Sequence, residues 1–200
     1  MTDVVGEAPA DVAPLPREKE PSDDQLVAAY LKGDQAAFQD LYARYKSSVF
    51  GYFKRQLSDA QAQDAFQDTW IKVIDRLGGY EQRGQFSGYL FTIAHNVLMD
   101  THRKEARSPI NSALENEDIL SDDTPDHALD KDQISAQFQV ELKKLPIHQR
   151  SVWILKQETA LSIEQIAKLT DSTKEGVKSR LRYANEKLKA GMQKYVRPRS

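Results

Sequence analysis

The chain has 200 residues, of which 40% are hydrophobic, enough to bury one sizeable core or two small ones. It contains no cysteine, which excludes a disulfide framework and a thiolate zinc site and fits a reducing cytoplasm. No apolar run approaches the roughly 20 residues that span a bilayer, and the N-terminus lacks the basic-then-apolar pattern of a signal peptide. We therefore expect a cytoplasmic protein without membrane insertion.

The net charge of −2 is distributed unevenly along the chain. From Ile134 to the C-terminus there are 14 Lys and Arg against 6 Asp and Glu, a balance of +8. From Glu105 to Gln133 the counts are 2 and 9, a balance of −7, and residues 1–104 carry −3. A basic C-terminal segment is typical of a protein that binds the phosphates of nucleic acid. The acidic middle segment cannot bind nucleic acid in this way and must have a different role.

The N-terminal half predicts a leader followed by an all-α domain. Residues 1–21 are rich in Pro, Ala and acidic residues without periodicity, which is typical of disorder. Apolar residues then recur at helical spacing in four stretches between residues 22 and 104. Ser22, Asp34 and Ser58 are the expected N-caps of the first three helices, and the fourth begins at Phe86 after a loop over residues 80–85.

The second half predicts a linker and a smaller helical domain. Residues 105–132 are acidic, contain two prolines and few large apolar residues, and are expected to form a flexible tether. Helical spacing resumes near Gln133 and continues to about residue 194, with Pro146 opening the second helix of this domain. The predicted fold is therefore all-α, with two small helical domains joined by an acidic linker.

A helix-turn-helix is predicted inside the C-terminal domain. Residues 162–169 read as a short helix capped by Ser162, residues 170–173 as a break, and the following segment as a second helix. Lys178 and Arg182 lie away from the apolar stripe of that second helix. Basic residues there suit a recognition helix in the major groove, although an ordinary helical hairpin with a solvated basic face would give the same pattern.

Four segments resemble, in order and spacing, motifs of bacterial sigma factors. They are residues 64–70 (DAFQDTW), 86–96 (FSGYLFTIAHN), 145–150 (LPIHQR) and 176–181 (GVKSRL). Two such domains joined by a short linker are the layout of the extracytoplasmic-function (ECF) group. The resemblance implies a region 2-like domain at residues 22–104 and a region 4-like helix-turn-helix domain at residues 133–194.

The resemblance assigns residues to core RNA polymerase and to promoter DNA. On the third helix an acidic face with one apolar residue would contact the clamp helices of the largest polymerase subunit, unless it is merely a solvated face. Those polymerase-binding residues are Asp64, Gln67, Asp68, Ile71 and Lys72. The loop and the fourth helix would melt and capture the downstream promoter element, a task that needs stacking rings and amides. Those residues are Tyr80, Arg83, Tyr89, Phe91, Asn96, Arg103 and Lys104.

Part of this aromatic set has a second interpretation, because Phe86, Tyr89 and Phe91 also fit a domain core. In the C-terminal domain, the side chains expected at the upstream promoter element are Thr173, Lys174, Lys178, Ser179, Arg180 and Arg182. Arg and Lys suit guanine edges and phosphates alike, so no single base contact is assigned. Most relatives are held by an anti-sigma factor, and one is expected here.

Enzyme chemistry finds no support in the sequence. His95 and His102 can share a helix face, but no third ligand completes a metal set, and no Gly-rich phosphate loop follows a strand. We therefore expect no catalytic residues, no metal and no cofactor. The sequence indicates a sigma factor that binds core RNA polymerase, recognises promoter DNA and helps to melt it. The alternatives are a stand-alone helix-turn-helix transcriptional regulator and, more distantly, a polymerase inhibitor.

The acidic linker has three possible roles. The resemblance implies a path into the polymerase cleft, where a charge of −7 would mimic nucleic acid. In the free protein the same charge could instead fold back on the basic domain and mask it, an effect that high salt would relieve. A solvated spacer is the third possibility.

Overall fold

The computed structural model describes residues 20–81, 84–107, 131–193 and 195, and these residues form helices and turns with no strand among them. The elements are α1 (Asp23–Leu31), α2 (Gln35–Lys54), α3 (Asp59–Arg76), the short 3₁₀ turn η1 (Leu77–Gly79), α4 (Phe86–Ala106), α5 (Lys131–Lys143), α6 (Ile147–Glu158), α7 (Ile163–Leu169) and α8 (Lys174–Met192). Most of the predicted leader and most of the acidic linker lie outside the described residues. Within the described part, no helix is both long and apolar enough to cross a membrane.

The helix starts follow from local capping chemistry. Ser22, Ser58 and Ser162 each accept a hydrogen bond from the backbone N–H of a glutamine three residues later, and the side-chain oxygen of that glutamine accepts one from the backbone N–H of the serine. This reciprocal pair satisfies two donors that the first helical turn leaves unpaired. Asp34 and Thr173 cap α2 and α8 through one side-chain oxygen each. The predicted N-caps are therefore confirmed.

Helices α1 to α4 pack around one apolar core, in which α3 lies against both α2 and α4. Aromatic rings fill the space between α2 and α3. Trp70 stands edge-on to Phe38 with ring centroids 5.9 Å apart and lies 4.9 Å from the ring of Tyr42. Such tilted and edge-to-face pairs add to the free energy gained from burying the rings.

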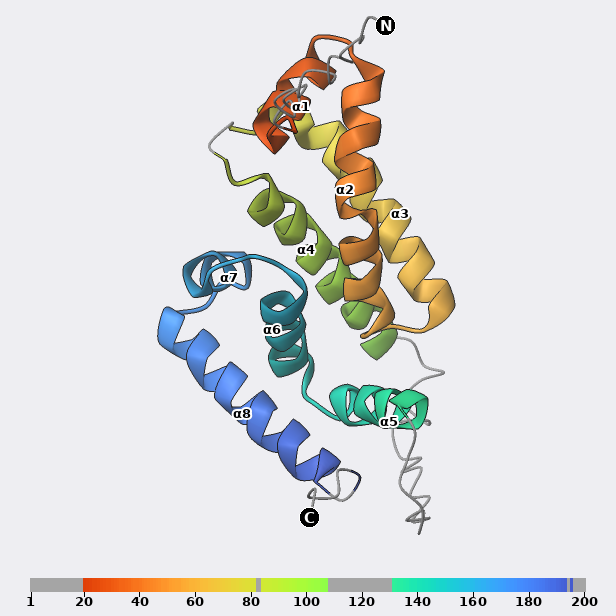
Figure 1. The fold of residues 1–200 in the computed structure, drawn as a ribbon, viewed down its shortest axis with the longest axis vertical. Coiled ribbons are helices and arrows are strands. Elements are labelled where there is room, and N and C mark those ends of the chain that lie inside the picture. Colours follow the sequence, from red (N-terminus) through yellow and green to blue (C-terminus); the bar gives the residue numbers. More distant parts are fainter. Residues whose placement is uncertain (1–19, 82–83, 108–130, 194, 196–200) are drawn as a thin grey trace, which may run out of the picture.

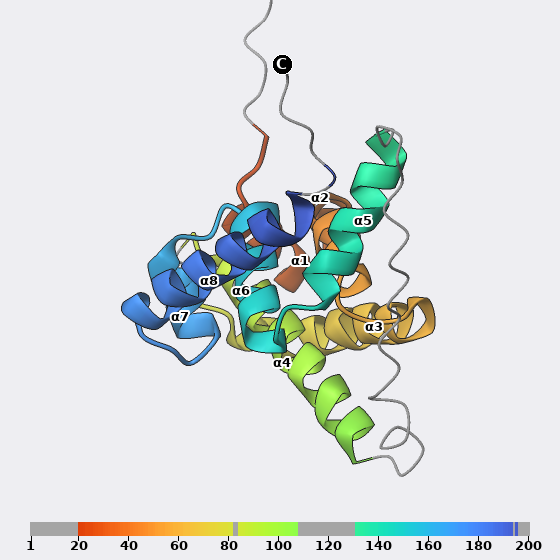
Figure 2. The ribbon, with the colours of Figure 1, turned by 90° about the horizontal axis from the view of Figure 1, so that it is seen from below.

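Helices α5 to α8 form a second group, with α8 packed against α5, α6 and α7. Its core contains the apolar stripe predicted for the recognition helix, since Val177, Ala184 and Leu188 are buried. In Figure 1, α8 runs the length of this group, and in Figure 2 α7 and α8 lie to one side of α4 while α3 lies to the other.

The two helix groups also touch each other, because α6 packs on α2 and α7 packs on α4. An ion pair between Arg55 of the first group and Glu158 of the second spans 2.9 Å. The sequence predicts two domains on a tether and contains no signal for this contact between them.

Two glycines allow a matched test of the backbone. Gly33 follows α1 with a φ of +103°, whereas Gly51 lies inside α2 with open space where a Cβ would be. We expect Gly33→Ala to lower the free energy of unfolding by about 1–2 kcal/mol, because L residues avoid that conformation. Gly51→Ala should raise it by about 0.5–1 kcal/mol through helix propensity. Urea unfolding of both variants measures this, and shifts of the same sign would contradict it.

Candidate functional site

The exposed face of α3 carries the first set of predicted residues. Asp64, Gln67, Asp68 and Ile71 are all exposed, Ile71 by 57%, and Lys72 is half-buried. The carboxylates border a groove of about 350 Å³ whose far side belongs to the end of α4. That groove is lined by Gln61, Asp64, Ala65, Gln67, Asp68, Thr101 and Lys104. The structure therefore brings these four residues together on one acidic face with an apolar contact point.

One further side chain extends the apolar part of that face. The sequence places Ile74 with the buried stripe of α3, but it is 43% exposed. Together with Ile71, one turn earlier, Ile74 adds to the exposed apolar surface of α3.

The loop after η1 is held in place by a side chain from α1. Asp24 accepts a hydrogen bond from the Tyr80 hydroxyl at 2.8 Å and another from the backbone N–H of Gly84 at 2.6 Å. Burial raises the pKa of Tyr80 to about 12, with the hydrogen bond to Asp24 and its charge adding to the effect. Sequence reasoning missed Asp24, because it precedes the loop by more than fifty residues. Arg83 lies outside the described residues.

The aromatic residues around this loop divide into surface and core. Tyr80 stacks at a tilt on Tyr89, with ring centroids 5.1 Å apart, and both rings are partly exposed. Phe86 is 1% exposed and belongs to the core. Phe91 is also 1% exposed and stands edge-on to Tyr52, so the prediction that its ring meets DNA is wrong for this arrangement. Its position on α4 points toward α2 rather than toward solvent.

The remainder of α4 offers one amide and two cations. Asn96, Arg103 and Lys104 are exposed, and Arg103 pairs with Asp100. His95 points inward, where its Nδ1 lies 2.9 Å from the Tyr52 hydroxyl in a hydrogen bond. No cluster of three or more metal-ligating side chains occurs in the part of the chain that the structure describes.

Buried His95 is uncharged at neutral pH. Burial, with smaller contributions from the nearby positive charges of His148 and Arg180, lowers its pKa to about 4. Further along α4, burial also lowers the pKa of His102. Neither imidazole therefore adds positive charge to α4 near pH 7, and the cations available to a DNA strand are those of its last two turns.

Helices α7 and α8 and the turn between them lie at the positions predicted for the helix-turn-helix. The turn passes through Asp171 at a φ of +47°, a left-handed conformation that Asp tolerates. Lys174 and Lys178 are exposed and pair with Glu164 at 2.9 Å and Glu175 at 3.1 Å. These surface pairs are weak, so both lysines can exchange their carboxylates for phosphates.

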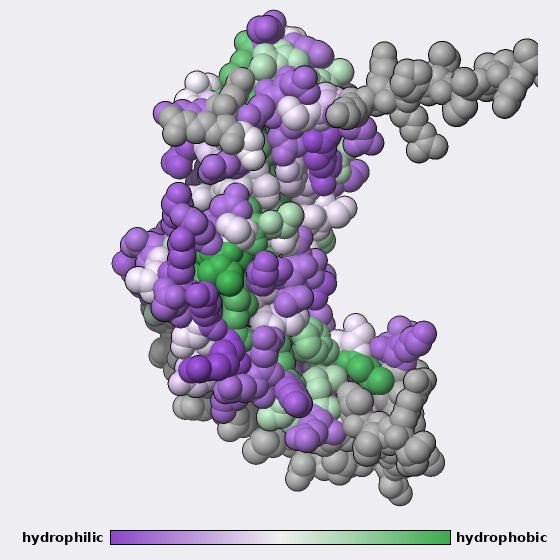
Figure 3. Space-filling model, turned by 60° about the vertical axis from the view of Figure 1, so that its left-hand side comes forward, coloured by the Kyte–Doolittle hydropathy of each residue, from purple (hydrophilic) through white to green (hydrophobic). Residues whose placement is uncertain are grey.

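The remaining residues of this set differ in exposure. Arg182 is exposed and lies 5.5 Å from the centre of the Tyr183 ring. The Thr173 side chain caps the start of α8, and the Ser179 side chain is half-buried. Arg180 turns back toward the turn and donates a hydrogen bond to Ser172 at 2.9 Å. Figure 3 shows the side of the molecule where α7 and α8 lie, with hydrophilic side chains over most of it and an apolar stretch at its middle.

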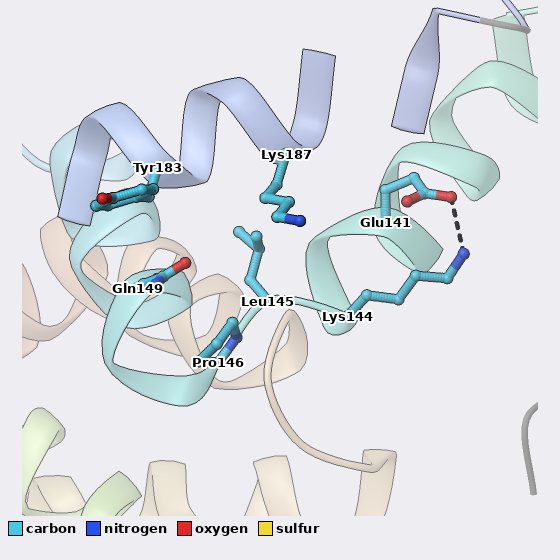
Figure 4. Close-up of a pocket in the computed structure, with 7 residues that line it drawn as sticks. All are labelled: Glu141, Lys144, Leu145, Pro146, Gln149, Tyr183 and Lys187. Atoms are coloured by element: carbon cyan, nitrogen blue, oxygen red, sulfur yellow. Dashed lines mark hydrogen bonds and ion pairs between the residues drawn. The ribbon is translucent and has the colours of Figure 1, made fainter. Parts of the chain in front are cut away.

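A groove between α5, α6 and α8 was not predicted from the sequence. It has a volume of about 360 Å³ and is lined by Glu141, Lys144, Leu145, Pro146, Gln149, Tyr183 and Lys187. Figure 4 shows Leu145 at its floor, Tyr183 on the α8 wall and Glu141 paired with Lys144 at its rim. The signal available in the sequence was an aromatic residue, Tyr183, next to the basic residues of α8. A single aromatic residue of this kind also occurs on surfaces without a groove.

Comparison with known proteins identifies the family. Residues 41–108 match the family model described as Sigma-70 region 2. The chain is 30% identical over 185 residues to RNA polymerase sigma-H factor of Pseudomonas aeruginosa, an alignment that covers 88% of this chain and 96% of that protein. It is 26% identical over 168 residues to ECF RNA polymerase sigma factor SigW of Bacillus subtilis, covering 79% and 90% of the two chains.

Two solved structures share the fold. CnrH in complex with the cytosolic domain of CnrY aligns with a TM-score of 0.63 at 23% identity, over 86% of this chain and 97% of that one. The sigma factor RpoE in complex with the anti-sigma factor NepR from Bartonella quintana aligns with a TM-score of 0.62 at 21% identity, over 78% and 96%. The sequence relationship spans nearly the whole chain, and this protein belongs to the ECF sigma factors, the non-enzymatic RNA polymerase subunits that serve transcription initiation.

Proposed function

We propose that this sigma factor uses three surfaces. One binds core RNA polymerase, one binds the downstream promoter element and one binds the upstream promoter element. The α1–α4 group acts as the region 2-like domain, and the α5–α8 group acts as the region 4-like domain. The observation that carries this division is the exposed acidic face of α3, together with the partly exposed rings of Tyr80 and Tyr89 at the start of α4. A stand-alone regulator has no use for an acidic, partly apolar helix face together with partly exposed rings at the start of α4.

The α3 face docks on core RNA polymerase, with the largest-subunit clamp helices as its expected site. Asp64 and Asp68 supply charge for a basic coiled-coil surface, and Ile71 supplies apolar contact between them and the helix end. Gln67 and Lys72 flank this contact. The added exposure of Ile74 supports a larger interface than the sequence predicts.

The downstream promoter element is captured at the loop and the exposed part of α4. Tyr80 and Tyr89 offer ring surface for an unstacked base, and Asn96 offers an amide for its edge. Arg103 and Lys104 supply backbone charge, with Arg83 as a further candidate from the sequence. Because Asp24 fixes the Tyr80 hydroxyl, the stacking platform is preorganised before DNA arrives.

The upstream element is contacted by the first turns of α8. Lys174, Lys178 and Arg182 are the exposed cations there, while Thr173 and Ser179 suit backbone phosphates. Arg180 can contact DNA only if its hydrogen bond to Ser172 breaks. We place the protein in the cytoplasm beside polymerase and expect an anti-sigma partner. NepR is such a partner for the fold relative RpoE, which supports the expectation.

In vitro transcription tests this function directly. Genomic DNA is transcribed by core RNA polymerase lacking any other sigma factor, with and without this protein, and the 5′ ends are mapped. We expect discrete start sites that appear only with the protein and share two upstream sequence elements. A regulator acting beside another sigma factor would yield no new start with core enzyme alone, and that result would overturn the proposal.

A further inference from the structure

The loop assigned to the downstream promoter element is closed by one carboxylate of α1. The two oxygens of Asp24 accept different hydrogen bonds, one from the Tyr80 hydroxyl at 2.8 Å and the other from the backbone N–H of Gly84 at 2.6 Å. Tyr80 is the first residue of that loop, and Gly84 lies next to its last residue, Gln85. Asp24 therefore joins the two ends of the loop from a distant helix.

The Tyr80 ring has little freedom in this arrangement. Its hydroxyl donates to Asp24 and accepts a hydrogen bond from the backbone N–H of Gln85 at 3.3 Å. The ring stands edge-on to the buried ring of Phe86, with centroids 5.6 Å apart, and packs at a tilt on Tyr89. Tyr80 is thus fixed at its hydroxyl by Asp24 and along its ring by two neighbours. It can offer ring surface to a base, but its hydroxyl proton is already used within the protein.

Helix α1 is itself a fixed base for this contact. Asp23, the residue before Asp24, pairs with Arg44 and accepts a hydrogen bond from the Tyr45 hydroxyl, and both partners lie on α2. The apolar residues of α1 are buried against α2 as well. The first turn of α1 therefore connects α2 to the loop, with Asp23 bound to the helix and Asp24 bound to the loop.

We infer that Asp24 is a positioning residue for promoter selectivity, which holds the loop and the Tyr80 ring in the arrangement that accepts the correct downstream base. The inference rests on the proposed function of that loop. A loop tied at both ends cannot re-form around a wrong base, whereas an untied loop can adapt to several, because flexible surfaces repack around different partners. Asp24 acts through the loop and does not touch DNA itself.

Base selectivity of the polymerase-bound protein tests the inference. The full chain, assembled with core RNA polymerase, is titrated with fluorescent single-stranded oligonucleotides that carry the mapped downstream element or that element with one base exchanged. We expect Asp24→Ala to bind the matched strand about tenfold more weakly and the exchanged strand nearly as wild type does, so the ratio of the two affinities falls about tenfold. Asp24→Asn should give an intermediate ratio, because its single carbonyl oxygen keeps only one of the two hydrogen bonds.

A double variant shows whether Asp24 acts through the loop. Tyr80→Phe keeps the ring and removes the hydroxyl that Asp24 holds. Alone, Tyr80→Phe should lower the affinity ratio by about three- to tenfold, but in the Asp24→Ala background it should change the ratio by less than about twofold. Equal effects of Tyr80→Phe in both backgrounds would mean that the two side chains act independently, which would overturn the inference.

Asp34→Asn is the matched control for charge. It removes one carboxylate at the start of α2, where Asp34 is the N-cap, and Asn caps a helix about as well as Asp. Its affinity ratio and its affinity for core RNA polymerase should equal those of wild type. A fall in its ratio as large as that of Asp24→Asn would assign the effect to net charge and contradict the inference.

Binding to core RNA polymerase separates positioning from folding. Asp24→Ala should keep the affinity of wild type for core enzyme and its helix content by circular dichroism. If it loses core affinity, or weakens matched and exchanged strands by the same factor, Asp24 serves the fold alone and the inference fails. If wild type is selective and Asp24→Ala equally so, only the inference fails. If wild type itself does not prefer the matched strand, the proposed function of the loop fails, and the inference with it.

Discussion

Asp64→Arg/Asp68→Arg is expected to weaken binding to core RNA polymerase by at least about a hundredfold, the largest effect predicted for any surface change. Both carboxylates are exposed on one face of α3 and border the same groove, so two charge reversals fall inside one contact area. Facing a basic partner, each arginine replaces attraction by repulsion. Titration of labelled protein with core enzyme, followed by fluorescence anisotropy, gives the dissociation constant.

A matched control separates the site from net charge. Glu20→Arg/Asp40→Arg changes the charge by the same amount at exposed positions near α1 and α2. Its affinity should stay within about twofold of wild type, because surface charges beyond the contact are screened. Equal losses in both double variants would show that overall charge, not the α3 face, governs docking. Circular dichroism verifies that both variants keep their helices.

Most helix starts were predictable because their capping chemistry is local in the sequence. Ser22, Ser58 and Ser162 each precede a glutamine by three residues, and that short pattern alone determines where α1, α3 and α7 begin. The helix ends are less determined by sequence. The first domain was expected to end near Lys104, but α4 continues to Ala106, and α5 begins at Lys131 rather than near Gln133. The basic residues in the last turn of α4 favour that extension.

The site was predictable where it depends on one helix face and not where it depends on packing between helices. Apart from Ile74, the exposed residues predicted on α3 and α8 follow from the 3.6-residue period. The burial of Phe91 does not, because it depends on which side of α4 meets Tyr52 of α2. The hydrogen bonds of Asp24 to the loop and the Arg55–Glu158 ion pair between the two helix groups are tertiary contacts between distant segments. No periodicity within one helix encodes them.

Removing two cationic side chains from α8 should weaken duplex binding and make the remaining affinity depend less on salt concentration. Lys178 and Arg182 are exposed one turn apart on the predicted recognition surface. We expect Lys178→Ala/Arg182→Ala to lower affinity for a duplex carrying a mapped upstream element by about ten- to a hundredfold. If both side chains neutralise phosphates, the slope of log affinity against log salt should also flatten by about 2, since each released counterion contributes close to one.

The same helix provides the control for this prediction. Lys187 and Lys189 are exposed toward the other end of α8, and Lys187→Ala/Lys189→Ala removes the same charge. Because only the first turns of a recognition helix reach the groove, that variant should keep both the affinity and the salt slope of wild type. A loss of affinity with an unchanged slope in Lys178→Ala/Arg182→Ala would mean that the two side chains read base edges instead of phosphates. Equal effects in both variants would show that the DNA-binding surface is not at the start of α8.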